Sequence, residues 1–137
     1  MKTHATNAEG MHLPALKDSG ERREFTNGAI RDRAQGKGRF DLLPVHGLLA
    51  VAKQMELGAL KYSERNWEKG IPLSCFVDSA MRHLVKVVAG FDDEPHLEAA
   101  CWNLLCLAEG RVRIATGIWP AEFDDLPKTY TGIEPKF

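Results

Sequence analysis

The feature that most constrains this fold is the run ACWNLLCLA, residues 100–108, in which Asn103 is the single polar residue. The run lies in a segment of helical character, about 95–115, that is apolar around nearly its whole circumference. A helix of this kind in a water-soluble protein is buried on several sides. Three helices of one chain would struggle to surround it, so we expect a partner chain to complete the bundle. Coverage by the terminal segments within a monomer is the alternative.

Two further helices are predicted before this one. After Pro44, apolar residues recur at spacings of three and four over about 45–62, a pattern typical of an amphipathic helix. A similar stripe follows over about 74–89, where Ser74 suits the N-cap and Gly90 the stop. The predicted fold class is therefore all-α, a helical bundle completed by oligomerisation.

Three segments of different character flank the predicted helices. Residues 1–24 are polar and lack apolar periodicity, so we expect a flexible, extended N-terminal arm. Residues 25–44 place glycines among cations and are predicted to form a basic loop. Residues 119–137 contain three prolines and no periodicity, which predicts an irregular, extended C-terminal tail. Residues 25–118, loop included, are then a single helical domain.

Length, charge and cysteine content exclude several classes of protein. The chain has 137 residues and balances 18 Lys and Arg against 19 Asp and Glu, so no overall basic field would hold nucleic acid. No apolar stretch approaches a membrane span, and no signal pattern opens the chain. We expect a cytoplasmic protein that binds neither nucleic acid nor membrane. The three cysteines fit no standard zinc spacing with His83 and His96, so a zinc site is not predicted.

Polar side chains line one side of the predicted helix 74–89. Ser79, Arg82, His83 and Lys86 follow one another at spacings of three, four and seven from the first, which places them on a single stripe. Such a stripe could receive an anion. The alternative is a solvated helix face on which Asp78 pairs with Arg82 one turn along.

The third predicted helix carries two polar residues seven positions apart, His96 and Asn103, on one face. Asn103 lies between apolar neighbours, so it is expected to be buried and to need hydrogen-bond partners. A purely structural Asn and a surface His are the alternatives for each residue taken alone. Together they favour a site.

Acidic residues on the three helices could converge on a metal ion. The candidates are Glu56, Asp78, Asp93, Glu94 and Glu98. Mg²⁺ binds a few carboxylate oxygens together with substrate phosphates. For Asp93 and Glu94 the alternative is a favourable interaction with the dipole at the start of a helix.

The loops supply candidate contacts for a nucleotide. Trp67 follows the first helix and could stack on a base while Asn66 reads the base edge, although such a Trp also commonly closes the end of a bundle. Cations that could contact a polyphosphate, if they are not simply solvated, are Lys61, Arg31, Lys37 and Arg39. No phosphate-binding loop of the GxxxxGK[ST] type and no His-Asp dipeptide occurs in the chain.

Five sequence blocks together carry a family resemblance. They are GAIRD at 28–32, GKGRFDLLP at 36–44, GALKYSERNWEKGIPLS at 58–74, DSAMRHL at 78–84 and DEPHLEAACWNLLCL at 93–107. In this order they resemble the phage and bacterial dATP/dGTP diphosphohydrolase family, which is similar to the MazG-like all-α nucleotide pyrophosphohydrolases. The resemblance implies an Mg²⁺-dependent enzyme, with Mn²⁺ able to substitute, that splits a purine deoxynucleoside triphosphate into the monophosphate and pyrophosphate. The apolar third helix separately favours a homodimer or homotetramer.

Under this resemblance the residues named above take specific roles. The expected metal ligands are Glu56, Asp78, Glu94 and Glu98. The expected catalytic groups are Glu94, Glu98, His83 and His96. The expected substrate contacts are Arg31, Lys37, Arg39, Lys61, Asn66, Trp67, Arg82 and Asn103. We expect the two imidazoles and the amide of Asn103 to orient substrate through hydrogen bonds rather than to ligate Mg²⁺.

Two other functions remain open at this point. A nucleotide-binding regulator without turnover is one, because the second and third helices lack the Glu-x-x-Glu and Glu-x-x-Asp pairs that MazG-like enzymes generally carry. A helical adaptor that uses the basic loop on a protein partner is the other. Release of pyrophosphate distinguishes the enzyme from the regulator, and stabilisation by nucleotide distinguishes both from the adaptor.

Overall fold

The structure is a computed structural model that describes residues 20–129 and 131–136. The chain divides into two compact units, Met1–Leu43 and Pro44–Phe137, which are described separately below. Most of the expected N-terminal arm, residues 1–19, lies outside the described residues.

The first unit contains a small β-hairpin. Strand β1, Arg22–Glu24, pairs antiparallel with β2, Ile30–Asp32. The turn between them suits Gly28, whose φ is +81°, and Asn27 Oδ1 accepts a hydrogen bond from the Ala29 amide at 3.2 Å. The predicted basic loop therefore includes a strand, and the all-α prediction was wrong for this unit. A short 3₁₀ helix, η1, follows at Phe40–Leu42.

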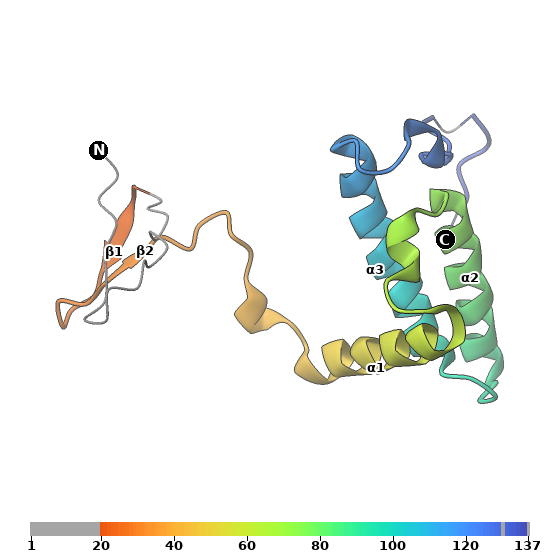
Figure 1. The fold of residues 1–137 in the computed structure, drawn as a ribbon, viewed down its shortest axis with the longest axis horizontal. Helices are drawn as coiled ribbons and strands as arrows, with labels where there is room; N and C mark the ends of the chain where they lie inside the picture. The colour runs from red at the N-terminus through yellow and green to blue at the C-terminus, as the bar shows by residue number, and fades with distance from the viewer. Residues whose placement is uncertain (1–19, 130, 137) are drawn as a thin grey trace. The chain divides into compact units, whose positions relative to one another are not determined.

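The second unit contains three helices, as the sequence predicts. Helix α1 spans Val45–Tyr62, α2 spans Leu73–Ala89 and α3 spans His96–Ala115. A 3₁₀ helix, η2, covers Asn66–Lys69 between the first two. α2 and α3 pack side by side along their length, and α1 contacts α3 (Figure 1). The described chain is thus mostly helical, with bounds within one residue of those expected for the three helices.

The core of this unit is formed by Leu73, Phe76, Cys106 and Trp119. Burial raises the pKa of the Cys106 thiol to about 11, so the thiol stays protonated and packs as a small apolar group. Trp119 is only 3% exposed although it lies in the segment expected to be an extended tail. Its indole N–H donates to the Glu68 carbonyl at 3.0 Å, which satisfies its polar atom inside the core.

Gly110 on α3 makes room for this Trp119 ring. A Cβ at position 110 would lie 2.6 Å from the indole of Trp119 and 2.9 Å from Leu73, so no larger residue fits without movement. The chain then continues into a third 3₁₀ helix, η3, at Ala121–Phe123. The segment after residue 118 is irregular, as expected, but it packs on the helices.

The same C-terminal segment caps α2. The Asp125 carboxylate accepts hydrogen bonds from the Ser74 amide at 2.8 Å and from its hydroxyl at 2.5 Å. These bonds lower the pKa of Asp125. Ser74 was expected to be the N-cap itself, but α2 begins one residue earlier and Pro72 occupies that position. Because Pro72 has no side-chain acceptor, the capping oxygen comes from elsewhere in the chain.

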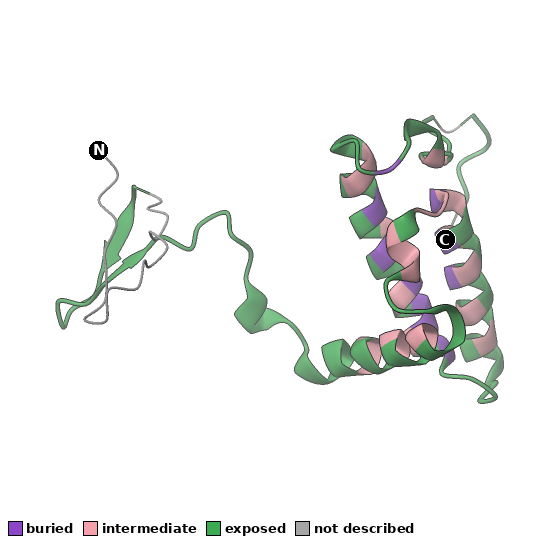
Figure 2. Cartoon of the chain, viewed as in Figure 1, coloured by how far each residue is buried: buried purple, intermediate pink, exposed green. Residues whose placement is uncertain are grey.

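Large apolar side chains remain exposed along α2 and α3. Figure 2 colours many positions on both helices as exposed. The most exposed of them are Met81, Val85, Val88, Leu97, Leu105 and Val112. The partner chain expected to cover the third helix stays a prediction. Among the described residues, no helix combines the length and the apolar character needed to cross a membrane.

Candidate functional site

Two histidines and a glutamate meet where α2 and α3 join. His83 lies on α2, Glu94 in the following turn, and His96 is the first residue of α3. The Nδ1 atoms of the two imidazoles are 2.9 Å apart, and Glu94 Oε2 lies 3.8 Å from His96 Nδ1. One ligand atom from each residue lies within 4.8 Å of the other two. We call these three residues the histidine cluster, and they form a candidate metal site.

A carboxylate outside the cluster fixes the orientation of His96. His96 Nε2 lies 2.8 Å from Asp93 Oδ1, and this hydrogen bond is the main cause of a lowered pKa at Asp93. The charged carboxylate only accepts, so the proton of the neutral imidazole is on Nε2. His96 Nδ1 is then an unprotonated nitrogen that faces His83.

His83 is held in its neutral form by its surroundings. Burial lowers its pKa first, and the neighbouring His96 lowers it further. The 2.9 Å between the two Nδ1 atoms is a hydrogen-bond distance, so one of them must donate a proton to the other. With a lone pair on His96 Nδ1, the donor is His83 Nδ1. The cluster therefore presents two imidazoles and one carboxylate.

Cationic side chains surround the histidine cluster. Lys86 Nζ lies 3.9 Å from Asp93 Oδ2, and Arg82 pairs with Asp78 one turn earlier on α2. That pairing is the one anticipated as the alternative for the polar stripe. The charges of Lys86 and Arg82 both act on His83.

Lys61, near the C-terminal end of α1, adds a third cation. A hydrogen bond to Tyr62 is the largest cause of its raised pKa, and the negative charge of Glu94 adds to it. Lys61 thus lies within electrostatic reach of the cluster. Two helices of this unit, α1 and α2, therefore place three positive charges near the same carboxylates.

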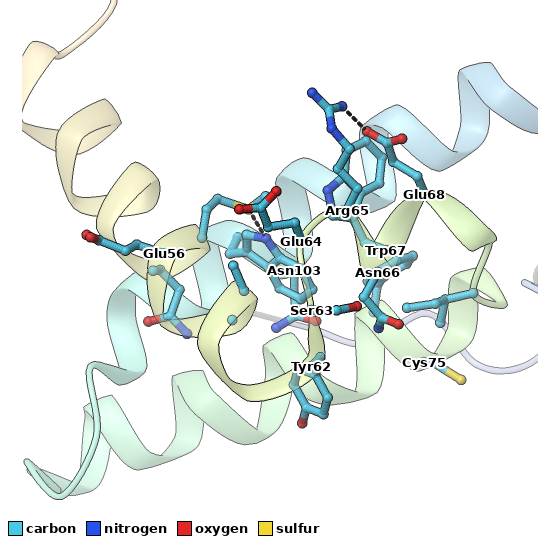
Figure 3. A pocket seen from close by; sticks show the side chains of 17 residues that line it. Glu56, Tyr62, Ser63, Glu64, Arg65, Asn66, Trp67, Glu68, Cys75 and Asn103 are labelled. Atoms are coloured by element: carbon cyan, nitrogen blue, oxygen red, sulfur yellow. Dashed lines mark hydrogen bonds and ion pairs between the residues drawn. The ribbon is translucent and has the colours of Figure 1, made fainter.

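A pocket of about 720 Å³ opens beside α1, η2 and α3 (Figure 3). Aromatic rings of Trp67, Phe76 and Trp102 line it, and four residues expected at the site border it. These four are Glu56, Asn66, Trp67 and Asn103. An apolar pocket with a few polar groups is the usual form of a small-molecule site.

Two of the predicted residues in this pocket have structural contacts as well. Trp67 packs edge-on against Trp119, with 6.5 Å between the ring centroids. The Arg113 guanidinium lies 4.8 Å from the centroid of the Trp67 ring. Asn103 is 5% exposed, and its amide donates to the Ala99 carbonyl at 2.8 Å. Trp67 thus both closes the end of the helices and lines the pocket.

Sequence reasoning missed Gln54, which also lines the pocket. Its carbonyl Oε1 is buried and, within the described part of the chain, has no hydrogen-bond partner. A buried acceptor without a donor costs free energy, so a ligand that donates a hydrogen bond would relieve it. Gln54 precedes Met55, a residue of the predicted apolar stripe. Nothing in the sequence pattern distinguishes Gln54 from a polar residue at the surface.

The structure gathers only part of the predicted metal-ligand set. Of the four expected carboxylates, Glu94 alone belongs to the one donor group found among the described residues. Glu56 borders the pocket, Asp78 pairs with Arg82, and Glu98 is half-buried on α3. Arg31, Lys37 and Arg39 belong to the first unit, where Arg39 pairs with Asp41 at 2.7 Å, and their contacts to substrate stay predictions.

The structure brings the two histidines together with Glu94 and without a thiol, a grouping that the sequence did not predict. The expectation that the cysteines do not join them in a zinc site stays a prediction. Asp93 was considered as a ligand, and the structure uses it instead to hold His96. The two histidines are 13 positions apart with a turn between them, so a search for short motifs does not connect them.

The pocket and the histidine cluster share one face of α3. His96 and Asn103 are both buried and are separated by two helical turns, about 10 Å along the axis. Ala99 and Ala100 lie between them and are buried as well, and both have small side chains. A ligand with an aromatic end and a charged end could span this distance.

A family model described as dATP/dGTP diphosphohydrolase, N-terminal, matches residues 27–116. The match covers more than half of the chain, including α1, α2 and α3 with both candidate sites. Comparisons with curated proteins and with solved structures gave no match.

Proposed function

This chain belongs to the dATP/dGTP diphosphohydrolase family, and from that premise we propose that it hydrolyses purine deoxynucleoside triphosphates. The proposed reaction converts dATP or dGTP and water into the monophosphate and pyrophosphate. The observation that carries the proposal is the shared face of α3, on which Asn103 borders an aromatic pocket and His96 a polar, charged cluster. These two ends suit the base and the phosphates of one nucleotide.

The purine is proposed to enter the aromatic pocket. Trp67 supplies a ring for stacking, and Asn66 and Asn103 supply amides that hydrogen-bond to a base edge. Gln54 Oε1 accepts a hydrogen bond from an exocyclic amine of the base, which satisfies an otherwise unpaired buried atom. Adenine and guanine each carry such an amine.

The triphosphate is proposed to lie toward the cations around the histidine cluster. Lys61 and Arg82 bind phosphate oxygens and offset the negative charge that develops on the departing pyrophosphate. Arg31, Lys37 and Arg39 of the first unit are further proposed phosphate contacts. Hydrolysis at the α-phosphorus forms a bond to the water oxygen and breaks the bond to the oxygen that bridges to the β-phosphate.

The attacking water is proposed to lie among the four expected catalytic groups. Glu94 and Glu98 accept the proton that the water loses, because a carboxylate is an acceptor at neutral pH. His83 and His96 orient the water, either through their own ring nitrogens or through a metal ion that they hold. The lowered pKa of His83 keeps its imidazole neutral and able to accept a hydrogen bond.

Dependence on a divalent cation is part of the proposal. A cation at the site would polarise a phosphoryl oxygen and lower the pKa of a bound water. The donors of the histidine cluster, two nitrogens and one carboxylate, suit a transition metal better than Mg²⁺, which prefers carboxylate and phosphate oxygens. Mg²⁺ ligation by Glu56, Asp78 and Glu98 stays a proposal.

A panel of nucleotides incubated with Mg²⁺ or Mn²⁺, with products resolved by chromatography, tests the function. We expect pyrophosphate together with dAMP or dGMP, and loss of turnover in excess EDTA. Unchanged turnover in EDTA would contradict the role of the metal. Saturable nucleotide binding without pyrophosphate would identify a regulator, and no thermal stabilisation by any nucleotide would favour an adaptor.

Substitution of Trp67 tests the base pocket. Trp67→Ala is expected to lower kcat/KM unevenly across bases, because stacking on an aromatic ring contributes about 1–3 kcal/mol per base. The measured quantity is the ratio of kcat/KM for dGTP to that for dCTP. Arg39→Ala is the comparison, since loss of a phosphate contact should weaken all triphosphates similarly. A Trp67→Ala enzyme with reduced activity but an unchanged ratio would show that Trp67 only closes the end of the helices.

A further inference from the structure

We propose that the histidine cluster holds a resident divalent transition metal, of the class that binds imidazole nitrogen, with Asp93 as the positioning residue for His96. The proposal goes beyond the hydrolytic function, because such a site binds its ion with no nucleotide present. It also differs from the expected Mg²⁺ site, which draws on carboxylates and substrate phosphates. The ligands are His83 Nδ1, His96 Nδ1 and a Glu94 carboxylate oxygen.

The three proposed ligand atoms lie close together although they come from different elements. The two Nδ1 atoms, one on each of two helices, are 2.9 Å apart, and the Glu94 oxygen lies 3.8 Å from that of His96. Metal–nitrogen bonds are about 2.0–2.1 Å long, so one ion beside this pair can reach both nitrogens. Moving the His83 proton from Nδ1 to Nε2 frees the second nitrogen without changing the charge of the ring.

A hydrogen bond from His96 to Asp93 prepares the imidazole for a metal ion. Histidines that bind metals commonly donate their other ring N–H to a carboxylate, which fixes the tautomer and strengthens the ligand. Asp93 Oδ1 accepts from His96 Nε2 at 2.8 Å, and the His96 side chain is 1% exposed. The ring is therefore held with Nδ1 directed into the cluster before any ion arrives.

The donor atoms of the cluster determine which ion it binds, and a surface hollow gives that ion access. Two imidazoles and one carboxylate form a donor set seen for zinc and for non-haem iron, with further positions left to water. Mg²⁺ binds nitrogen poorly in comparison. Asp93, Glu94 and His96 line a hollow at the surface with residues 91 and 92, so an ion can reach the cluster from solvent.

The competing interpretation is a metal-free hydrogen bond that joins α2 to α3. Titration of chelator-stripped protein with Co²⁺ separates the two, because Co²⁺ bound by nitrogen gives visible absorption bands without any enzymatic assay. We expect saturation at one Co²⁺ per chain, displacement by Zn²⁺, and little displacement by a large excess of Mg²⁺. Absence of binding, or equal displacement by Mg²⁺, would overturn the proposal.

Two neighbouring carboxylates provide a matched pair of variants. Asp93→Asn is expected to weaken Co²⁺ affinity by about 10–100-fold, because it removes the acceptor that orients His96. Asp92→Asn makes the same charge change one residue away, where the structure shows no bond to either imidazole, and should leave affinity within about twofold. Both side chains lie in the exposed turn, so neither change is expected to unfold the protein. Equal losses in the two variants would contradict the positioning role.

Removal of a ligand completes the test. Glu94→Gln and His83→Asn should each abolish the Co²⁺ bands while circular dichroism stays native. Bands that persist in both variants would overturn the ligand assignment. Because the titration contains no nucleotide, metal binding without pyrophosphate release contradicts the proposed hydrolysis alone, and pyrophosphate release with Mg²⁺ by protein that binds no Co²⁺ contradicts this inference alone.

Discussion

Glu94→Gln is expected to lower turnover of dATP and dGTP by about a hundredfold or more. The substitution keeps the shape of the side chain and removes a negative charge from the histidine cluster, where Glu94 lies 3.8 Å from His96 and acts on Lys61. Glu94 is also the one expected carboxylate that the cluster contains. Steady-state release of pyrophosphate under saturating nucleotide measures the effect.

The control for this change is Glu122→Gln in η3, which alters the same charge at an exposed position away from both sites. Circular dichroism should be native for both variants. Glu56→Gln provides the comparison within the predicted ligand set, with the same loss expected if Glu56 binds metal at the pocket edge. A variant with native circular dichroism and a loss of less than about threefold would place its residue outside the reaction.

Trp119→Ala is expected to lower the free energy of unfolding by about 3–5 kcal/mol. The ring is 3% exposed, packs on Phe76 with 6.5 Å between centroids, and fills the space that Gly110 leaves open. Its loss leaves a cavity and also an unpaired carbonyl at Glu68. Equilibrium unfolding in urea, followed by far-ultraviolet circular dichroism, measures the change.

Ile118→Ala is the matched control for the tryptophan. Ile118 precedes Trp119 directly but is 64% exposed, so its truncation should change the free energy of unfolding by no more than about 0.5 kcal/mol. If both substitutions cost the same small amount, the segment after residue 118 would not be part of the core.

The helices could be predicted from the sequence because apolar spacing and end residues within each segment indicate where it begins and ends. α1 begins and ends at the residues where the three-and-four spacing does, and Gly90 ends α2 in the left-handed conformation that favours glycine. The hairpin was missed because its strands are three residues long and wholly exposed, so they show no alternation of apolar and polar residues.

The candidate site could be predicted only in part because its contacts are not local. His83 and His96 were each recognised as polar residues on a helix face, but their contact depends on how α2 and α3 pack across the intervening turn. The unpaired Gln54 oxygen is likewise visible only once the neighbouring helices exclude water from it. Asn103 was correctly predicted to be buried, since its apolar neighbours on the helix already indicate it.

The C-terminal segment affects the order in which this unit can fold during synthesis. The hydrogen bonds from Trp119 to Glu68 and from Ser74 to Asp125 each join residues 51 positions apart. A ribosome releases the chain from its N-terminus, so α2 emerges before Trp119, which completes the core around Leu73 and Phe76. Until Trp119 and Asp125 emerge, this core lacks one of its aromatic rings and α2 lacks its cap. The helical unit therefore becomes stable late, in a step that waits for the last part of the chain rather than proceeding helix by helix.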